Sequence, residues 1–216
     1  MTFDSNFASL DLNESLTRAL ADAGYAEATE VQARAIPPAI AGRDLMVASS
    51  TGSGKTASFV IPALERVLAA RASGEHRERG TVYGPRVLVL APTRELAMQV
   101  AKAATVYGRH VPGLRVATVV GGVRYARQIQ ALRWPLDILI ATPGRLLDHL
   151  TSGKAVLDNV EILVLDEADR MLDMGFIDDI TTIAEHTPKA RQTLMYSATF
   201  AGHVGRLALQ LLREPQ

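Results

Sequence analysis

Eight consecutive residues combine the types and the spacing of a phosphate-binding loop, G-x-x-x-x-G-K-[ST]. They are Ser49, Ser50, Thr51, Gly52, Ser53, Gly54, Lys55 and Thr56, and Ser49 stands where the first glycine usually does. Gly52 and Gly54 allow the tight turn in which successive backbone N–H groups converge on phosphate oxygens at a helix N-terminus. Lys55 would place its ammonium group on the β- and γ-phosphates, and Thr56 would offer its hydroxyl to Mg²⁺. A glycine-rich turn without a ligand is the alternative, but the position between an apolar run and a helical pattern favours nucleotide binding.

Two carboxylates follow a second apolar run, at 162–165, where Asp166 and Glu167 come directly after Ile-Leu-Val-Leu. The carboxyl ends of parallel strands line one crevice, so we expect Asp166 opposite the phosphate-binding loop. Asp166 would hold Mg²⁺ through water, and Glu167 would orient the water that attacks the γ-phosphate. Acidic helix caps also follow many strands. Together with the loop, however, the pair predicts Lys55, Asp166 and Glu167 as catalytic residues, and Thr56 and Asp166 as metal-binding residues.

Rigid elements must hold these side chains, and the sequence predicts strands that alternate with helices. Strands are expected at 45–48, 86–91, 115–120, 136–141, 160–165 and 192–197, and helices at 13–23, 31–41, 56–70, 94–108, 124–132 and 178–186. Nearly continuous Val, Ile and Leu is typical of parallel strands that are covered on both faces. The alternation therefore predicts an α/β fold, a parallel sheet with helices on both faces. The charged stretch 72–85 is expected to be an exposed loop whose arginines are solvated.

Composition narrows the class of protein. The 216 residues are 48% apolar and 21% charged, with 16 Gly and 10 Pro, which excludes disordered and collagen-like chains. The absence of cysteine excludes disulfides and thiolate metal sites. The N-terminus lacks the features of a signal peptide, and no apolar run reaches the ~18 residues of a membrane span. We expect a single cytoplasmic domain without a membrane partner, preceded by a short helical extension: residues 1–42 form the extension and 43–216 the nucleotide-binding domain.

Further motifs carry a family resemblance. Residues 166–169 read Asp-Glu-Ala-Asp, residues 24–32 resemble an adenine-reading Q motif, and Phe7 lies seventeen residues before Gly24. Three other segments are Pro92-Thr93-Arg94, Gly121-Gly122 and Thr142-Pro143-Gly144-Arg145, and a last one is Ser197-Ala198-Thr199. In this order, from residue 7 to 199, the motifs resemble those of the first RecA-like domain of the DEAD-box RNA helicases.

The resemblance implies an ATP-dependent RNA helicase and assigns roles to residues. ATP would be bound by Phe7, Tyr25, Thr29 and Gln32 together with the eight residues of the loop. RNA would be held through its backbone, without sequence reading, by Pro92, Thr93, Arg94, Gly121, Gly122, Thr142, Pro143, Gly144 and Arg145. Hydrolysis would be coupled to strand separation by Asp169, Ser197 and Thr199. A RecA-like P-loop fold, ATP as substrate, Mg²⁺ as cofactor and a second RecA-like domain as partner are implied as well.

The residues support these roles unequally. A carboxamide such as Gln32 can both donate to and accept from an adenine edge, although by itself it is only a polar helix residue. The segments that begin at Pro92 and Thr142 could be ordinary capped turns, and Ser197 and Thr199 could be turn residues. Local charge favours RNA: the chain is neutral overall, with 23 basic and 23 acidic residues, but no carboxylate lies between Glu95 and Asp137, where six Lys or Arg residues occur.

Two departures and one missing part qualify the resemblance. Ala28 replaces the usual proline of the Q motif, and Ser49 replaces a small apolar residue at the start of the loop. The chain ends 17 residues after Thr199, which leaves no room for a second RecA-like domain with its arginine finger. We therefore expect these 216 residues to bind ATP or ADP with Mg²⁺, to hydrolyse ATP poorly and not to unwind duplexes. A single-domain ATP or RNA sensor, a metabolic kinase, a DNA translocase and a relative with a dead site are the alternatives.

Overall fold

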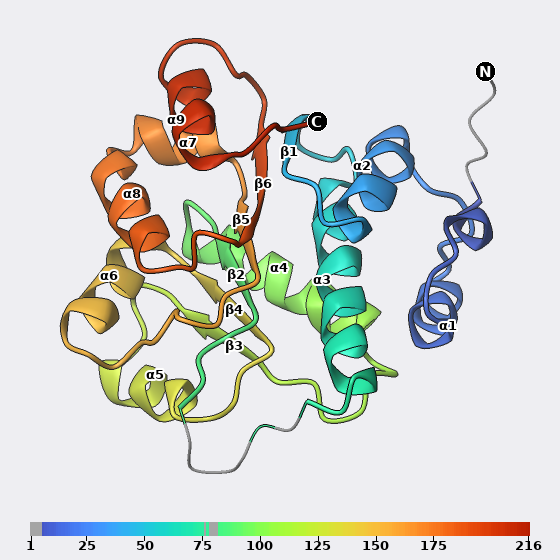
Figure 1. Ribbon diagram of the computed structural model, residues 1–216, viewed down its shortest axis with the longest axis horizontal. Coiled ribbons are helices and arrows are strands. Elements are labelled where there is room, and N and C mark those ends of the chain that lie inside the picture. The colour runs from blue at the N-terminus through green and yellow to red at the C-terminus, as the bar shows by residue number, and fades with distance from the viewer. Residues whose placement is uncertain (1–5, 76, 78–81) are drawn as a thin grey trace.

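A single six-stranded parallel sheet forms the centre of the protein in the computed structural model, which describes residues 6–75, 77 and 82–216 (Figure 1). The strand order is β1-β6-β5-β2-β4-β3, and every neighbouring pair is parallel. The strands are β1 (Leu45–Ala48), β2 (Val87–Leu90), β3 (Val116–Val119), β4 (Ile138–Ala141), β5 (Ile162–Leu165) and β6 (Gln192–Ser197). Because all strands run the same way, their carboxyl ends share one edge of the sheet.

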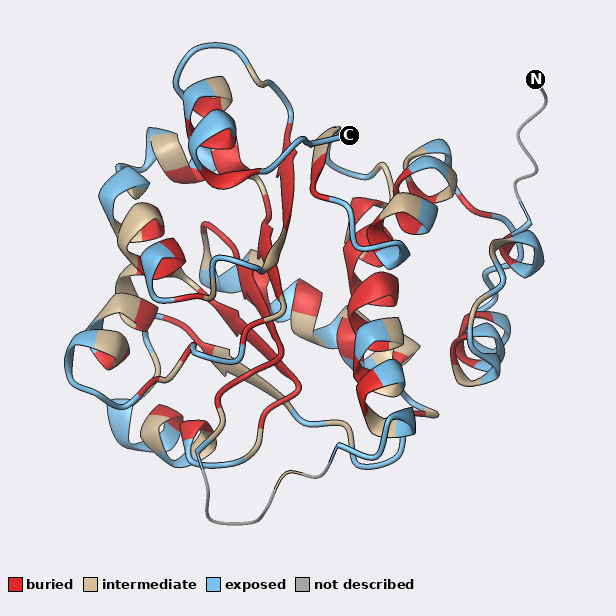
Figure 2. Cartoon of the chain, in the orientation of Figure 1, coloured by how far each residue is buried: buried red, intermediate tan, exposed pale blue. Residues whose placement is uncertain are grey.

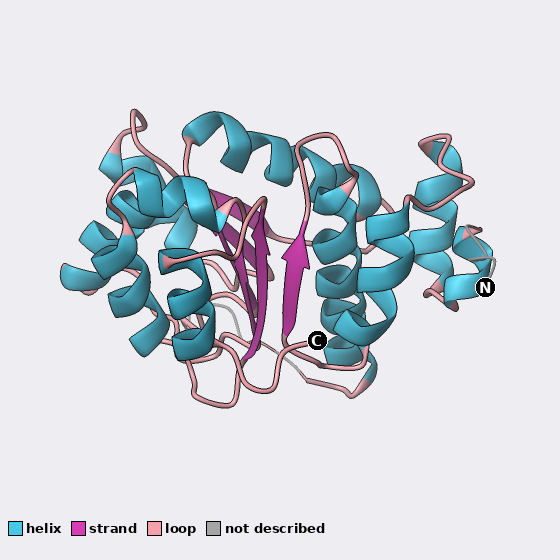
Figure 3. Cartoon of the chain, turned by 90° about the horizontal axis from the view of Figure 1, so that it is seen from above, coloured by secondary structure: helices cyan, strands magenta, loops and turns pink. Residues whose placement is uncertain are grey.

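Helices cover both faces of the sheet (Figure 3). They are the 3-10 helix η1 (Phe7–Leu10), α1 (Glu14–Asp22), α2 (Glu30–Ile40), α3 (Lys55–Ala72), α4 (Arg94–Tyr107), α5 (Tyr125–Leu132), α6 (Pro143–Thr151), α7 (Ala168–Asp173), α8 (Ile177–Glu185) and α9 (His203–Leu211). Residues from η1 and α1 to α4 pack on one face of the sheet, and residues from α5 to α9 pack on the other. The N-terminal extension shares the first of these cores, since Phe7 and Leu16 belong to it.

Continuous apolar runs explain the central strands. All residues of β2, β4 and β5 are buried (Figure 2). Successive side chains alternate between the two cores: Val87 and Val89 join one cluster, whereas Leu88 and Leu90 join the other. A strand that must satisfy two apolar layers therefore has no polar position, which is why its sequence reads as an unbroken run.

The predicted fold class and its six strands are confirmed, with strand ends that differ by at most two residues. The six predicted helices are present as well. Helices η1, α6, α7 and α9 were not predicted from the sequence, although α9 carries an amphipathic signal, with Val204, Leu207, Ala208 and Leu211 buried at helical spacing. α6 was missed because Pro143 was interpreted as part of a binding segment, whereas it is the first residue of a helix. The expected division at residues 42 and 43 stays a prediction.

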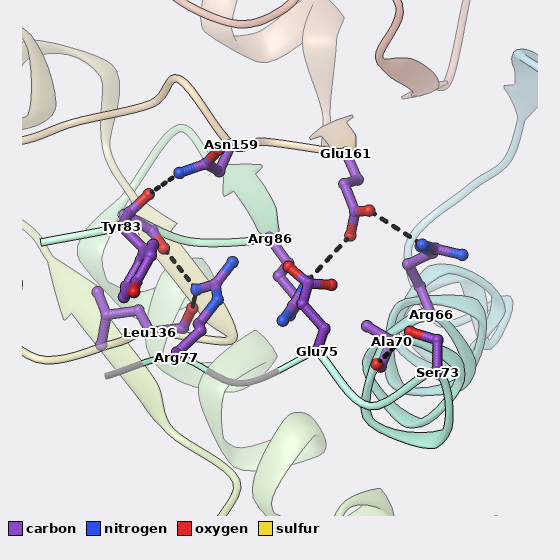
Figure 4. A network of polar contacts seen from close by, with 11 residues as sticks. Arg66, Ala70, Ser73, Glu75, Arg77, Tyr83, Arg86, Leu136, Asn159 and Glu161 are labelled. Atoms are coloured by element: carbon purple, nitrogen blue, oxygen red, sulfur yellow. Dashed lines mark hydrogen bonds and ion pairs between the residues drawn. The ribbon is translucent and has the colours of Figure 1, made fainter. Parts of the chain in front are cut away.

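The prediction of an exposed, solvated loop at 72–85 is wrong for part of its described residues (Figure 4). Ala72 is the last residue of α3. Arg77 is half-buried and donates to the carbonyl oxygens of Gly84 and Leu136, at 2.8 and 2.7 Å. Glu75 accepts a hydrogen bond from Arg86, whose guanidinium is buried and needs a carboxylate. The loop is thus tied to the starts of β2 and β4. The remaining charged residues of the prediction, Glu78 and Arg79, lie outside the described residues.

The only tryptophan of the sequence, Trp134, follows α5 at the opposite end of the sheet from the phosphate-binding loop. Its ring is partly exposed, and the Arg115 guanidinium carbon lies 4.7 Å from the ring centroid. Arg115 immediately precedes β3, one of the two edge strands. This cation–π contact therefore joins the end of α5 to the start of β3.

None of the helices in the described part of the chain has both the length and the apolar character of a membrane-spanning segment.

Candidate functional site

The predicted phosphate-binding loop connects β1 to α3 at the carboxyl edge of the sheet. Gly52 and Gly54 both have a φ of +82°, the left-handed region that glycine adopts without strain. α3 begins at Lys55, and no side chain caps its first turn. The N–H groups of this turn therefore remain available to a ligand, in the arrangement that binds phosphate. The N–H of Ser49 donates to the Ser197 carbonyl oxygen at 3.0 Å, which fixes the start of the loop to the end of β6.

Gln32 and Thr29 pack against Gly54, so that position requires glycine for steric reasons as well as for its positive φ. A Cβ atom at Gly54 would lie 2.6 Å from the Gln32 amide nitrogen and 2.9 Å from the Thr29 hydroxyl. The Gln32 Nε2 donates to the Gly54 carbonyl oxygen at 3.0 Å, and its Oε1 accepts from the Thr29 N–H at 3.0 Å. Gln32 is thus the N3 residue of a capping box that starts α2. Its carboxamide keeps one N–H and one lone pair for a ligand.

Lys55 brings the loop and the two predicted carboxylates together. Its Nζ lies 2.9 Å from Oδ1 of Asp166 and 3.2 Å from Oε1 of Glu167. Lys55 is 8% exposed and Asp166 only 1%, so the cluster is withdrawn from solvent. Glu167 has a φ of +52° at the start of α7, a conformation that a non-glycine residue rarely adopts. This strained turn aims both carboxylates at the loop, and strain of this kind is typical of functional sites.

Asp166 carries a charge that its surroundings disfavour. Burial raises the pKa of this carboxyl, although the Lys55 ammonium acts in the opposite direction. Oδ1 of Asp166 contacts Lys55 but makes no well-directed hydrogen bond within the described residues, and a buried carboxylate oxygen in that state is under-satisfied. A divalent cation would satisfy it. The described residues contain no group of three or more His, Cys, Asp or Glu that could hold a metal by themselves, so Mg²⁺ would need further ligands from phosphate and water.

Two cavities flank Lys55. One, of about 370 Å³, lies between the loop and α4 and is lined by Gly54, Thr56, Gln99 and Asp166 among others. The other, of about 230 Å³, is lined by Ser49, Glu167, Asp169, Arg170 and Ala198 among others. Gln99 and Arg170 were not predicted as site residues from the sequence. Each lies on a helix next to a predicted motif, but only the packing of α4 and α7 against the loop reveals that both border the cavities.

The aromatic residues expected at the nucleotide differ in exposure. Phe7 is 4% exposed and belongs to the apolar core, and its N–H donates to the Ala26 carbonyl oxygen. Tyr25 is 48% exposed, with its ring centroid 6.0 Å from that of Tyr107. Burial and the neighbouring Tyr25 raise the pKa of Tyr107 to about 12. Phe7 is thus buried in the core beside the Q-motif segment, whereas the ring of Tyr25 is exposed to solvent.

The segments assigned to RNA lie at the carboxyl ends of β2, β3 and β4, next to one another in the sheet. Thr93 caps α4 by accepting from the Leu96 N–H, and Arg94 is exposed directly after it. Gly122 has a φ of +79°, and a Cβ atom there would lie 3.0 Å from a guanidinium nitrogen of Arg94. The Gly121-Gly122 turn and Arg94 are therefore in contact. Pro92 is buried below them.

The third of these segments, Thr142 to Arg145, starts α6 with Pro143 in its first turn. Gly144 is half-buried. Arg145 turns back towards the Gly121-Gly122 turn: its Nη1 donates to the Val123 carbonyl oxygen at 2.6 Å, and its guanidinium lies 4.0 Å from the Tyr125 ring centroid. The structure thus brings all three segments to one continuous stretch of the sheet edge.

The residues expected to couple the two sites lie between them. The Ser197 hydroxyl donates to the Thr199 carbonyl oxygen at 2.6 Å, within its own turn after β6. Asp169 borders the smaller cavity together with Ala198. Tyr196, which the sequence analysis missed, is fully buried, and its hydroxyl lies 2.6 Å from that of Ser58 in α3. Burial raises the pKa of Tyr196. β6 is therefore joined to α3, the helix that begins with the loop.

Comparison with known proteins identifies the family. A profile of the DEAD/DEAH box helicases matches residues 29–207. The ATP-dependent RNA helicase DeaD of Klebsiella pneumoniae is 44% identical over 214 residues, which are 99% of this chain and 32% of the relative. SrmB of Escherichia coli strain K12, also an ATP-dependent RNA helicase, is 44% identical over 98% of the chain and 46% of its own length. The chain thus spans about a third of the DeaD sequence. With its RecA-like sheet and the matched profile, the chain belongs to the DEAD/DEAH box helicase family.

Proposed function

We propose that this chain is the ATP-binding part of an ATP-dependent RNA helicase and that it binds ATP with Mg²⁺ between the phosphate-binding loop and Asp166. The observation that carries the proposal is the contact of Lys55 with both Asp166 and Glu167. The ammonium group contacts one buried carboxylate, Asp166, and one partly buried carboxylate, Glu167. When Mg·ATP binds, the Lys55 ammonium group would leave the carboxylates and contact phosphate oxygens. The Asp166 carboxylate would then contact the divalent cation.

The residues divide the chemistry. Lys55 and the free N–H groups at the start of α3 would hold the β- and γ-phosphates. Thr56 and Asp166 would hold Mg²⁺, which when bound supplies positive charge to the phosphates. Glu167 would orient the attacking water, since its carboxylate reaches the same point as Lys55. Gln32 would read the adenine edge with the hydrogen-bonding positions that Thr29 and Gly54 leave free.

RNA would lie across the carboxyl ends of β2, β3 and β4, held by its phosphates and sugars. Arg94, Gly122 and Arg145 are neighbours there, and backbone N–H groups, hydroxyls and arginines suit contacts that carry no sequence information. Asp169, Ser197 and Thr199 would link this stretch to the nucleotide. We propose that duplex separation requires a second RecA-like domain, for which the longer relatives have room, so these residues alone should hydrolyse ATP slowly. A cytoplasmic location stays a prediction.

Calorimetric titration of this chain with ATP, ADP and GTP in the presence of Mg²⁺ tests the proposal. Both adenine nucleotides should bind, and GTP should bind more weakly. Equal affinity for ATP and GTP would show that Gln32 does not select adenine. No binding of any nucleotide would overturn the proposal itself. In a longer protein with both domains, ATP hydrolysis should be stimulated by RNA. Equal stimulation by DNA would favour a DNA translocase instead.

A further inference from the structure

Gln128 is a buried carboxamide on α5, a helix that carries none of the motifs identified above. Its side chain faces inwards, and the residue is only 2% exposed, whereas Gln130 on the same helix is exposed. A buried amide costs free energy unless its donors and acceptors find partners. The partners of Gln128 all lie in or beside two of the segments proposed to hold RNA.

Three hydrogen bonds converge on this one side chain. Its Nε2 donates to the Val120 carbonyl oxygen at 2.8 Å, directly before Gly121-Gly122. Its Oε1 accepts from Nη1 of Arg145 at 3.2 Å, and His149 Nε2 lies 2.9 Å from the same oxygen. Because a carbonyl oxygen only accepts, His149 must carry its proton on Nε2. One carboxamide thus ties the end of β3 to two residues of α6.

The surrounding contacts leave Arg145 little freedom. It also donates to the Val123 carbonyl oxygen, and its guanidinium lies against the Tyr125 ring. The Tyr125 hydroxyl in turn donates to Asp148 of α6 at 2.8 Å. Burial lowers the pKa of His149, and the nearby Arg145 charge acts in the same direction, which favours the neutral ring. Satisfied polar networks around a buried side chain such as Gln128 hold a single geometry.

We propose that Gln128 is a positioning residue for RNA binding: it sets the distance between the Gly121-Gly122 turn and the Thr142–Arg145 segment so that both meet one RNA backbone. Gln128 is too buried to touch RNA and acts through Val120 and Arg145. The inference rests on the proposed function, because it needs RNA at this edge. Successive phosphates lie at fixed spacing along a strand, so a shift between the two segments would lose contacts on one side.

The test replaces Gln128 with methionine, which is similar in length and suits a helix but makes none of the three hydrogen bonds. Gln130→Met on the exposed side of α5 is the matched control. Retention of labelled single-stranded oligouridine on filters would give the RNA affinity of this chain with Mg²⁺ and a non-hydrolysable ATP analogue, over a range of salt concentrations. Calorimetry and thermal unfolding would give nucleotide affinity and stability of the same samples.

We expect Gln128→Met to weaken RNA binding about 10-fold and to leave nucleotide affinity within twofold. The dependence of RNA affinity on salt should become shallower, because each lost phosphate contact removes about 0.7 from the logarithmic slope. A role in stability alone would not change that slope while the protein is folded. If Gln128→Met does not fold, His149→Phe, which removes one of the three bonds, should weaken RNA binding about threefold.

The outcomes separate the two proposals. Wild-type chain that fails to bind RNA would overturn the proposed RNA site, and the inference with it. Wild-type chain that binds RNA, with folded Gln128 and His149 variants that bind equally well, would overturn the inference alone. The inference would also be overturned if Gln130→Met caused the same loss, or if RNA and nucleotide affinity fell together.

Discussion

The two regions proposed to bind ligands share one edge of the sheet but are built differently. At the nucleotide side, Lys55, Asp166 and Glu167 are held by charge, and a ligand must replace their mutual contacts. At the RNA side, Gln128 and Arg145 are held by hydrogen bonds to backbone carbonyl oxygens, which a ligand need not disturb. We therefore expect the proposed nucleotide site to be rearranged by its ligand and the proposed RNA site to be formed in advance. Substitutions should therefore affect the two sites separately.

The largest effect is expected from Glu167→Gln in a longer protein with both domains. The amide keeps the size of the side chain but cannot polarise the attacking water, so RNA-stimulated ATP turnover should fall by about 10²–10⁴-fold. Affinity for Mg·ATP and for RNA should remain within a few-fold. Steady-state hydrolysis and equilibrium binding measure the two quantities. Normal turnover would show that Glu167 has no part in the chemistry.

Lys55→Ala breaks the nucleotide side without reaching the RNA side. It removes the proposed phosphate contact and leaves the buried Asp166 without its ammonium partner, so affinity for Mg·ATP should fall by about 100-fold or more. RNA affinity measured without nucleotide should not change. Lys102→Ala, an exposed lysine on α4, is the control and should bind ATP normally. Unchanged ATP affinity in Lys55→Ala would show that the phosphate-binding loop does not bind the phosphates of ATP.

Gly54→Ala and Gly52→Ala separate two kinds of strain in the loop. Both glycines have the same positive φ, but only a methyl group at Gly54 would meet Gln32 and Thr29. The backbone term should cost each variant about 1–2 kcal/mol of stability. Gly54→Ala should lose more, together with about 10-fold in ATP affinity, because Gln32 is displaced as well. Chemical denaturation and calorimetry would show this, whereas equal losses at both positions would mean that the Gln32 contact is unimportant.

The smallest effect concerns stability and pH. Burial raises the pKa of Asp166 above its value in the unfolded chain, so its charge lowers stability at neutral pH. This cost declines as the pH falls below the pKa of the folded state and is gone below the pKa of the unfolded chain. Asp166→Asn should therefore melt at a higher temperature than wild type at pH 8, and the difference should narrow once the pH falls below the pKa of the folded state. Asp173→Asn, at an exposed position, is the control. A difference that widens in acid would contradict the assignment.

Local sequence patterns predicted most of the strands and helices but fewer of the side-chain contacts at the two proposed sites. Apolar runs such as that of β5 predicted the buried strands, because a strand between two helical layers has no polar position. The loop residues predicted a turn and a helix start, because glycine and lysine have local reasons to occur there. Gln128 could not be found in this way: its partners, Val120, Arg145 and His149, lie 8 to 21 residues away in sequence and meet only when α5 packs on α6.

The same limit applies to charge. The charged stretch 72–85 was predicted to be solvated, but its Arg77 donates to the Leu136 carbonyl oxygen before β4, and its Glu75 pairs with the buried Arg86 before β2. Only the tertiary structure decides whether a charged residue is solvated or paired. Lys55 shows the opposite case, in which the motif alone predicted a residue close to Asp166 and Glu167, because parallel strands bring their carboxyl ends together.

The position of Trp134 makes it an intrinsic fluorescence probe for movements far from the phosphate-binding loop. Its indole is the single strong intrinsic fluorophore of the sequence, and it contacts Arg115 beside β3, across the sheet from β1 and at the other end of the strands. Nucleotide in the loop would not touch it. Emission that changes when ATP is added would therefore record a movement transmitted through the sheet, and unchanged emission would mean that the far corner of the protein remains still while the loop is filled.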